Sequence, residues 1–184
     1  GKTRMKILLT GASRGLGLKI CEVLLARGDE VFAVSRRQSD ALEKLGEQFP
    51  DKLRFKSADL SDADAARRAI FAADFVSPET VLGAFVTNAA TAYDDIITNM
   101  NADKLRAMFE VNTFAPMILA KYAIRNMILH GTRGAIVHIS SVSVHTGYKG
   151  LAMYAASKGA LEAFSKNTAR EWGVRGIRSN AVAA

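Results

Sequence analysis

The sequence has very little cysteine and no long apolar segment. One cysteine, Cys21, occurs among 184 residues, so no disulfide can form within the chain, and this fits a reducing compartment. No uninterrupted apolar run approaches the roughly 18 residues that a membrane-spanning helix needs. These absences exclude a disulfide-stabilised scaffold. They predict a cytoplasmic protein with no membrane partner.

The composition is that of a globular domain with a basic surface. Hydrophobic residues make up 49% and charged residues 23% of the chain, which is enough for one good core. A net charge of +7 is compatible with nucleic-acid binding. The basic residues are scattered, however, and no nucleic-acid-binding motif accompanies them. The histidines and the Asp94-Asp95 pair show no metal-ligand spacing. We therefore expect neither a nucleic-acid partner nor a metal site.

A glycine-rich segment follows the first apolar stretch of the chain. Residues 5–10 read as a buried strand and residues 18–27 as a helix, and Gly11, Gly15 and Gly17 lie between them. Glycine permits a sharp turn and the close approach of backbone N–H groups to a ligand. The N-terminus of the following helix favours an anion. This order of elements favours a phosphate cradle over an ordinary glycine-rich turn.

The residues after the second apolar strand indicate which anion binds. Residues 30–34 form this strand, and Ser35, Arg36 and Arg37 follow it. A site that prefers NAD usually has an acidic residue here, which holds the ribose 2′-hydroxyl. Arginine can instead bind a 2′-phosphate through charge-assisted hydrogen bonds, and Arg14 in the cradle adds another cation. We therefore expect NADP(H), although a solvated basic loop would look similar.

The remainder of the chain alternates between strand and helix without a linker or repeat. Strands are expected at 53–58, 81–87, 135–140 and 177–182, and helices at 61–72, 103–129 and 151–172. This alternation predicts an α/β fold with a doubly wound parallel sheet, the Rossmann fold, in one domain of residues 1–184. The ligand of such a sheet lies at the carboxyl ends of its strands.

A tyrosine and a lysine near the end of the chain suggest proton transfer. Tyr154 and Lys158 lie one helical turn apart, and Ser141 precedes the tyrosine by thirteen residues. An unperturbed tyrosine has a pKa near 10, and we expect the Lys158 charge to lower it. Together with the cradle, this set predicts carbonyl or alcohol redox chemistry on a nicotinamide cofactor. Alone, the pair would more often be a packing feature of a helix.

A proline predicts an interruption in the helix expected at 103–129. Pro116 has no N–H, so the carbonyl of Asn112, four residues earlier, loses its usual helical partner. We expect the helix to kink there.

The chain resembles the short-chain dehydrogenase/reductase family over nearly its whole length. The closest resemblance is to the 3-oxoacyl-carrier-protein reductase-like branch of its single-domain form. The motifs that carry the resemblance are Thr10-Gly11-Ala12-Ser13-Arg14-Gly15-Leu16-Gly17, Asp59-Leu60, Asn88-Ala89, Val111-Asn112, Ile139-Ser140-Ser141, Tyr154 with Lys158, and residues 177–182.

The resemblance implies a role for each matching residue. Tyr154 would be the general acid or base, Ser141 would orient the substrate oxygen, and Lys158 would assist Tyr154. The carbonyl of Asn112 would hold a water in a proton relay. His145 and Tyr148 could line the substrate pocket or face solvent. The cofactor-binding residues would be Gly11, Ser13, Arg14, Gly15, Leu16, Gly17, Ser35, Arg36, Asp59, Leu60, Asn88, Ala89, Tyr154 and Lys158.

Family members usually continue past the sixth strand with a substrate-covering segment and a seventh strand, so the resemblance predicts a C-terminally incomplete domain.

Two functions remain open. One is an NADP(H)-dependent oxidoreductase that interconverts a carbonyl and an alcohol, with a 3-oxoacyl thioester as one substrate. The other is an NADP-binding scaffold or sensor without efficient turnover. The small apolar residues of the helices at 103–129 and 151–172 predict a homodimer or homotetramer.

Overall fold

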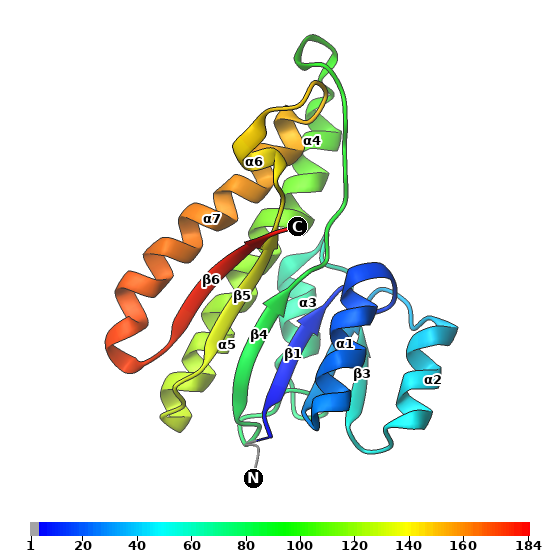
Figure 1. The fold of residues 1–184 in the computed structure, drawn as a ribbon, viewed down its shortest axis with the longest axis vertical. Helices are drawn as coiled ribbons and strands as arrows, with labels where there is room; N and C mark the ends of the chain where they lie inside the picture. Colours follow the sequence, from blue (N-terminus) through cyan, green and yellow to red (C-terminus); the bar gives the residue numbers. More distant parts are fainter. Residues whose placement is uncertain (1–3) are drawn as a thin grey trace.

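Six parallel strands form a single sheet in the computed structural model, which describes residues 4–184. Their order across the sheet is β3-β2-β1-β4-β5-β6, so the direction of winding reverses between β1 and β4 (Figure 1). The strands are β1 (Lys6–Thr10), β2 (Glu30–Ser35), β3 (Leu53–Ser57), β4 (Leu82–Thr87), β5 (Ala135–Ser140) and β6 (Arg178–Ala183). The expected Rossmann fold is confirmed. The first three residues of the expected domain lie outside the described residues.

Helices pack on both faces of the sheet. They are α1 (Gly15–Arg27), α2 (Asp40–Gln48), α3 (Ala63–Ile70), α4 (Ala102–Phe109), α5 (Ala115–His130), α6 (Ser143–Thr146) and α7 (Ala152–Trp172). Figure 1 shows α1 on the near face and α3 and α5 on the far face.

The central strand β1 divides its apolar side chains between the two faces. Leu8 packs in a cluster with residues of α3 and α5, whereas its neighbour Leu9 packs with residues of α1 and α2. Both side chains are fully buried. A strand that is buried on both faces reads as a continuous apolar run, which explains why β1 was predictable from its sequence. The sheet therefore provides a rigid base for the loops at its carboxyl edge.

The helix expected at 103–129 is divided by a wider turn. α4 and α5 are joined by a π-helical segment, η2 (Glu110–Phe114), in which the Ala115 N–H donates to the Glu110 carbonyl five residues earlier. Pro116 lies in the first turn of α5 and cannot donate to Asn112. The expected interruption is thus found at the expected place, and it takes the form of a π-helical turn.

Two helices were not predicted from the sequence. α2 begins after Ser39, whose hydroxyl accepts a hydrogen bond from the Leu42 N–H. The residues between β2 and Asp40 form the turn that carries Arg36 and Arg37. The four-residue helix α6 begins at Ser143, two residues after Ser141. α1 also begins at Gly15, three residues earlier than expected, because the glycine-rich segment already forms its first turn.

Candidate active site

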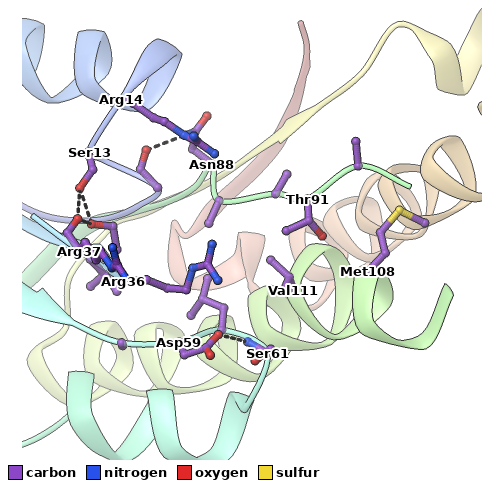
Figure 2. A pocket seen from close by; sticks show the side chains of 18 of the residues that line it. Ser13, Arg14, Arg36, Arg37, Asp59, Ser61, Asn88, Thr91, Met108 and Val111 are labelled. Atoms are coloured by element: carbon purple, nitrogen blue, oxygen red, sulfur yellow. Dashed lines mark hydrogen bonds between the residues drawn. The ribbon is translucent and has the colours of Figure 1, made fainter. Parts of the chain in front are cut away.

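A cleft of about 1240 Å³ lies at the carboxyl edge of the sheet, where the winding reverses. This volume exceeds the usual range for sites that take a drug-sized ligand. Figure 2 shows residues from the loops after β1, β2, β3 and β4, together with Met108 and Val111 at one end. The predicted cofactor residues that line the cleft are Gly11, Ser13, Arg14, Gly15, Ser35, Arg36, Asp59, Leu60, Asn88 and Ala89.

The three glycines of the cradle serve different purposes. A Cβ on Gly17 would lie 1.8 Å from the Gly11 carbonyl oxygen, so Gly17 allows α1 to pack on the preceding turn. Gly11 has φ +70°, and a Cβ at this position would lie 2.8 Å from the backbone of Ala89. Gly15 has φ +55°, and no atom lies within 4 Å of where its Cβ would be. Only Gly15 therefore leaves open space for a ligand.

The N-terminus of α1 opens beside this space. Arg14 precedes the helix in an extended conformation and provides no side-chain cap, and the first turn of α1 contains no acidic residue. The backbone N–H groups of an uncapped first turn attract an anion. The exposed residues Arg14, Arg36 and Arg37 line the same cleft and add positive charge. The cleft thus fits the phosphates of a dinucleotide.

Serine hydroxyls shape the turn after β2. The hydroxyls of Ser13 and Ser35 lie within hydrogen-bond distance of each other and, at 2.6 and 2.7 Å, of the Arg37 carbonyl oxygen, and their two protons are shared among these three contacts. The Ser39 hydroxyl donates to the carbonyl of Ser13. These contacts join the cradle to the basic turn, as Figure 2 shows for Ser13. Ser39 was not among the predicted site residues, because its contact depends on the folded turn.

Asp59 lies beside the basic turn, because the preceding residues Ser57 and Ala58 donate hydrogen bonds to the carbonyls of Arg36 and Ser35. Its carboxylate accepts a hydrogen bond from the Ser61 N–H at 2.9 Å. This bond, the Ser61 side chain and the charge of Arg36 hold the pKa of Asp59 below its usual value. Asp59 therefore stays ionised and can accept hydrogen bonds.

Asn88 holds the cradle in place. Its side-chain amide donates to the Gly11 carbonyl at 3.0 Å, and its backbone N–H donates to the Thr10 hydroxyl at 3.1 Å. The same hydroxyl accepts from the Ala89 N–H at 3.2 Å. The ends of β1 and β4 are thereby joined at the point of reversal.

Asn112 is fully buried in the π-helical turn and clamps the loop after β4. Its amide donates to the Thr91 carbonyl at 2.8 Å and to the Ser157 hydroxyl at 3.1 Å. Its side-chain oxygen accepts from the Thr91 N–H at 2.8 Å. Asn112 thus connects α7, next to Lys158, to a loop that lines the cleft. This side-chain role was not predicted from the sequence, where only the backbone carbonyl of Asn112 stood out.

Lys158 is buried on α7 and points to the end of β5. Its ammonium donates to the Ile139 carbonyl at 3.0 Å, and burial lowers its pKa to about 8. The expectation that the pKa of Tyr154 is lowered is wrong for this structure. The pKa of Tyr154 is raised, first by burial and then by the charge of Asp94. The cause is that desolvation of the phenolate outweighs any attraction from the lysine.

Ser141 lies between β5 and α6, and its hydroxyl makes hydrogen bonds to Ser143. The Ser141 oxygen lies 2.8 Å from the Ser143 hydroxyl and accepts from the Ser143 N–H at 3.2 Å. Ser143 is buried and was not predicted as a site residue. Nearby, Tyr148 is exposed and His145 pairs with Glu162 at 2.8 Å, and neither residue lines the cleft.

The structure separates the predicted residues into two groups. One group lines the cleft. The second, outside the cleft lining, consists of Leu16, Gly17, Asn112, Ser141, Tyr154 and Lys158. The groups are connected through Thr91, which lines the cleft and binds Asn112. Tyr93, Lys104 and Met108 also line the cleft, and they were not predicted because no motif marks them.

Residues 4–184 were also searched for membrane-spanning helices and for metal-binding groups of side chains. No helix in this range is long and apolar enough to cross a membrane. No group of three or more His, Cys, Asp or Glu side chains in the same range is arranged to hold a metal ion.

The fold and the site define a dinucleotide-binding α/β protein, and comparison with known proteins gives its family. A family model described as short chain dehydrogenase matches residues 5–184. The chain belongs to this family of oxidoreductases.

About a third of the aligned residues are identical between the chain and two known relatives. The chain is 33% identical to "Carbonyl reductase [NADPH] 2" of Sus scrofa and 34% identical to L-xylulose reductase of Homo sapiens. These alignments cover 97% and 96% of the chain, and 70% and 69% of the relatives. A short-chain dehydrogenase from Streptomyces avermitilis superimposes with a TM-score of 0.87 at 30% identity, over 98% of the chain and 64% of that structure. These relatives do not single out the 3-oxoacyl-carrier-protein reductase branch.

Proposed function

We propose that the chain is an NADP(H)-dependent oxidoreductase that interconverts a carbonyl and an alcohol. The observation that carries the proposal is the open N-terminus of α1 in a cleft lined by Arg14, Arg36 and Arg37. The carbonyl reductase of Sus scrofa, one of the relatives, also carries NADPH in its name. The cradle, Asp59 with Leu60, and Asn88 with Ala89 would hold the cofactor, and residues 1–184 would act as a single dinucleotide-binding domain.

When bound, NADPH supplies a hydride to the carbonyl carbon. The Tyr154 hydroxyl then donates its proton to the carbonyl oxygen, so that an alcohol and a tyrosinate form. The raised pKa of Tyr154 keeps this proton in place until the carbonyl oxygen becomes basic. In the reverse direction, the tyrosinate accepts the proton of the alcohol.

Neighbouring groups orient the substrate and stabilise the tyrosinate. The Ser141 hydroxyl would exchange its contact with Ser143 for a hydrogen bond to the substrate oxygen. With a pKa of about 8, Lys158 is mostly protonated at pH 7, and its charge would stabilise the tyrosinate once it forms. The Asn112 carbonyl would hold a water that returns a proton through Lys158.

We propose a small ketone as the substrate and a cytoplasmic location. L-Xylulose is a first candidate because relatives that match over more than 95% of the chain are L-xylulose reductases. A 3-oxoacyl thioester is the second, since one similar structure, at 27% identity, is described as a putative betaketoacyl-ACP reductase. Assays with both substrates and NADPH would rank them.

The Tyr154→Phe variant tests the proposed chemistry. It removes only the proton donor, so we expect turnover to fall by roughly 10²-fold or more, the contribution of a general acid. NADPH affinity, measured by fluorescence titration, should stay close to that of the parent protein. A Tyr154→Phe variant with normal turnover would contradict the proposal and favour an NADP-binding scaffold without efficient turnover.

A further inference from the structure

Glu162 lies on the same stripe of α7 as the two proposed catalytic side chains. Tyr154, Lys158 and Glu162 follow one another at intervals of four residues, and this spacing places them on one face of the helix. The stripe contacts consecutive residues at the end of β5. Lys158 donates to the Ile139 carbonyl, and Glu162 accepts a hydrogen bond from Ser140. Glu162 thus continues the contact between α7 and the strand that ends beside Ser141.

The Glu162 carboxylate holds the segment that carries Ser141 at two points. The Ser140 hydroxyl donates to Oε2 at 2.5 Å, and His145 Nε2 lies 2.8 Å from Oε1. Ser140 directly precedes Ser141, and His145 lies in α6, four residues after it. One side chain therefore binds both ends of this short segment, and each carboxylate oxygen has its own partner.

Burial makes these contacts stronger than a surface pair. The Glu162 side chain is only 16% exposed, and Ser140 is 4% exposed. Burying a carboxylate without hydrogen-bond partners costs free energy. The folded protein therefore favours the arrangement in which both oxygens of Glu162 have a partner. His145 is 61% exposed and closes the contact on the solvent side.

We infer that Glu162 is a positioning residue, which fixes the Ser141 segment against the helix that carries Tyr154 and Lys158. The inference rests on the proposed function, because it gives Ser141 a substrate oxygen to orient. Small displacements of an orienting group lower turnover strongly, by up to about 10²-fold for 1 Å. Glu162 does not touch the substrate in this account and acts only through Ser140 and His145.

Two variants of Glu162 separate positioning from general stability. Glu162→Ala removes both contacts. Glu162→Gln can keep both, because its oxygen accepts from Ser140 and its amide donates to His145 Nε2 when the imidazole proton lies on Nδ1. Glu171→Ala is the matched control, since Glu171 is an exposed residue at the end of the same helix.

We expect Glu162→Ala to lower kcat by roughly tenfold while the Kd for NADPH stays unchanged, and Glu162→Gln to restore most of kcat. Amide hydrogen exchange should become faster over residues 140–146 in Glu162→Ala but not in Glu162→Gln or Glu171→Ala. Unchanged kcat and exchange in Glu162→Ala would overturn the inference. If the parent protein does not turn over a ketone, the proposed function fails, and exchange alone then decides whether Glu162 fixes this segment.

Discussion

At the scale of single residues, we propose that the basic turn after β2 determines which nicotinamide cofactor binds in the cleft. Ser35 lies where a carboxylate would repel a 2′-phosphate, and its hydroxyl is held by the Arg37 carbonyl. Arg36 and Arg14 are exposed and line the cleft, so both are available to an anion. Neither arginine is needed to hold the sheet, and their substitution should change binding without unfolding the protein.

We expect NADPH to bind more tightly than NADH by about 1–3 kcal/mol, the scale of a hydrogen bond to a charged group. The double variant Ser35→Asp with Arg36→Ala should reverse this preference, because a carboxylate then faces the ribose. Arg125→Ala removes an exposed arginine from α5 and is the control for charge alone. Calorimetric titration with both cofactors measures the difference, and equal affinities in the parent protein would refute the role of Arg36.

Another residue-scale prediction concerns His138, which is fully buried on β5. Its Nδ1 lies 2.8 Å from the Thr87 hydroxyl, and no hydrogen-bond partner is found for Nε2 among the described residues. Burial first, and then the charge of Lys158, lowers its pKa to about 4. Between pH 6.5 and 4 the unfolded chain therefore binds a proton that the folded protein does not.

Relative to a His138→Asn variant, the parent protein should lose about 2–4 kcal/mol of stability as the pH falls from 6.5 to about 4. Above pH 6.5 the difference between the two proteins should be constant. Urea unfolding at several pH values measures it. A difference that does not change with pH would mean that His138 is not held neutral.

At the scale of elements, the π-helical turn η2 positions the loop after β4. Asn112→Ala removes the hydrogen bonds to both backbone groups of Thr91 and to Ser157. We expect a loss of about 2–3 kcal/mol in the free energy of unfolding, because buried polar groups lose their partners. In the control Asn167→Ala, a single exposed bond to the Ala163 carbonyl is lost, and the change should stay within about 0.5 kcal/mol. Denaturant unfolding measures both changes. Equal losses of stability in Asn112→Ala and Asn167→Ala would contradict the proposed role of Asn112 in holding the loop after β4.

The elements also explain what the sequence could predict. β1, β5 and α7 were predicted to within one residue, because their apolar patterns and flanking glycines are local signals. Gly11, Ser13, Arg14 and Gly15 of the cradle line the cleft together with residues that follow β2, β3 and β4, because the carboxyl ends of parallel strands share one edge. The Asn112 clamp and the Glu162 contacts were not predictable, since their partners lie far apart in sequence. The raised pKa of Tyr154 depends on burial, which no spacing of residues gives.

At the scale of the whole molecule, the two long helical segments leave small and apolar residues exposed. Ala156 and Ala163 on α7 and Leu129 on α5 face solvent, with Leu129 71% exposed. We expect a homodimer or homotetramer formed through these helices, because small residues allow a partner helix to approach closely. Light scattering should give a multiple of the chain mass. Ala163→Glu should weaken the assembly, whereas Ala26→Glu on the exposed face of α1 should not. A strictly monomeric mass for the parent protein would contradict this interface.

We propose that the protein transfers a hydride from NADPH to a ketone while Tyr154 supplies the proton. A deuterium-transfer experiment tests this reaction. With NADPH deuterated at the transferred position and L-xylulose or a 3-oxoacyl thioester as substrate, mass spectrometry of the product should find a single deuterium on the carbinol carbon. The Tyr154→Phe variant should form little of this product although it binds NADPH. Tight binding of NADPH by the parent protein without any deuterated alcohol would contradict the account.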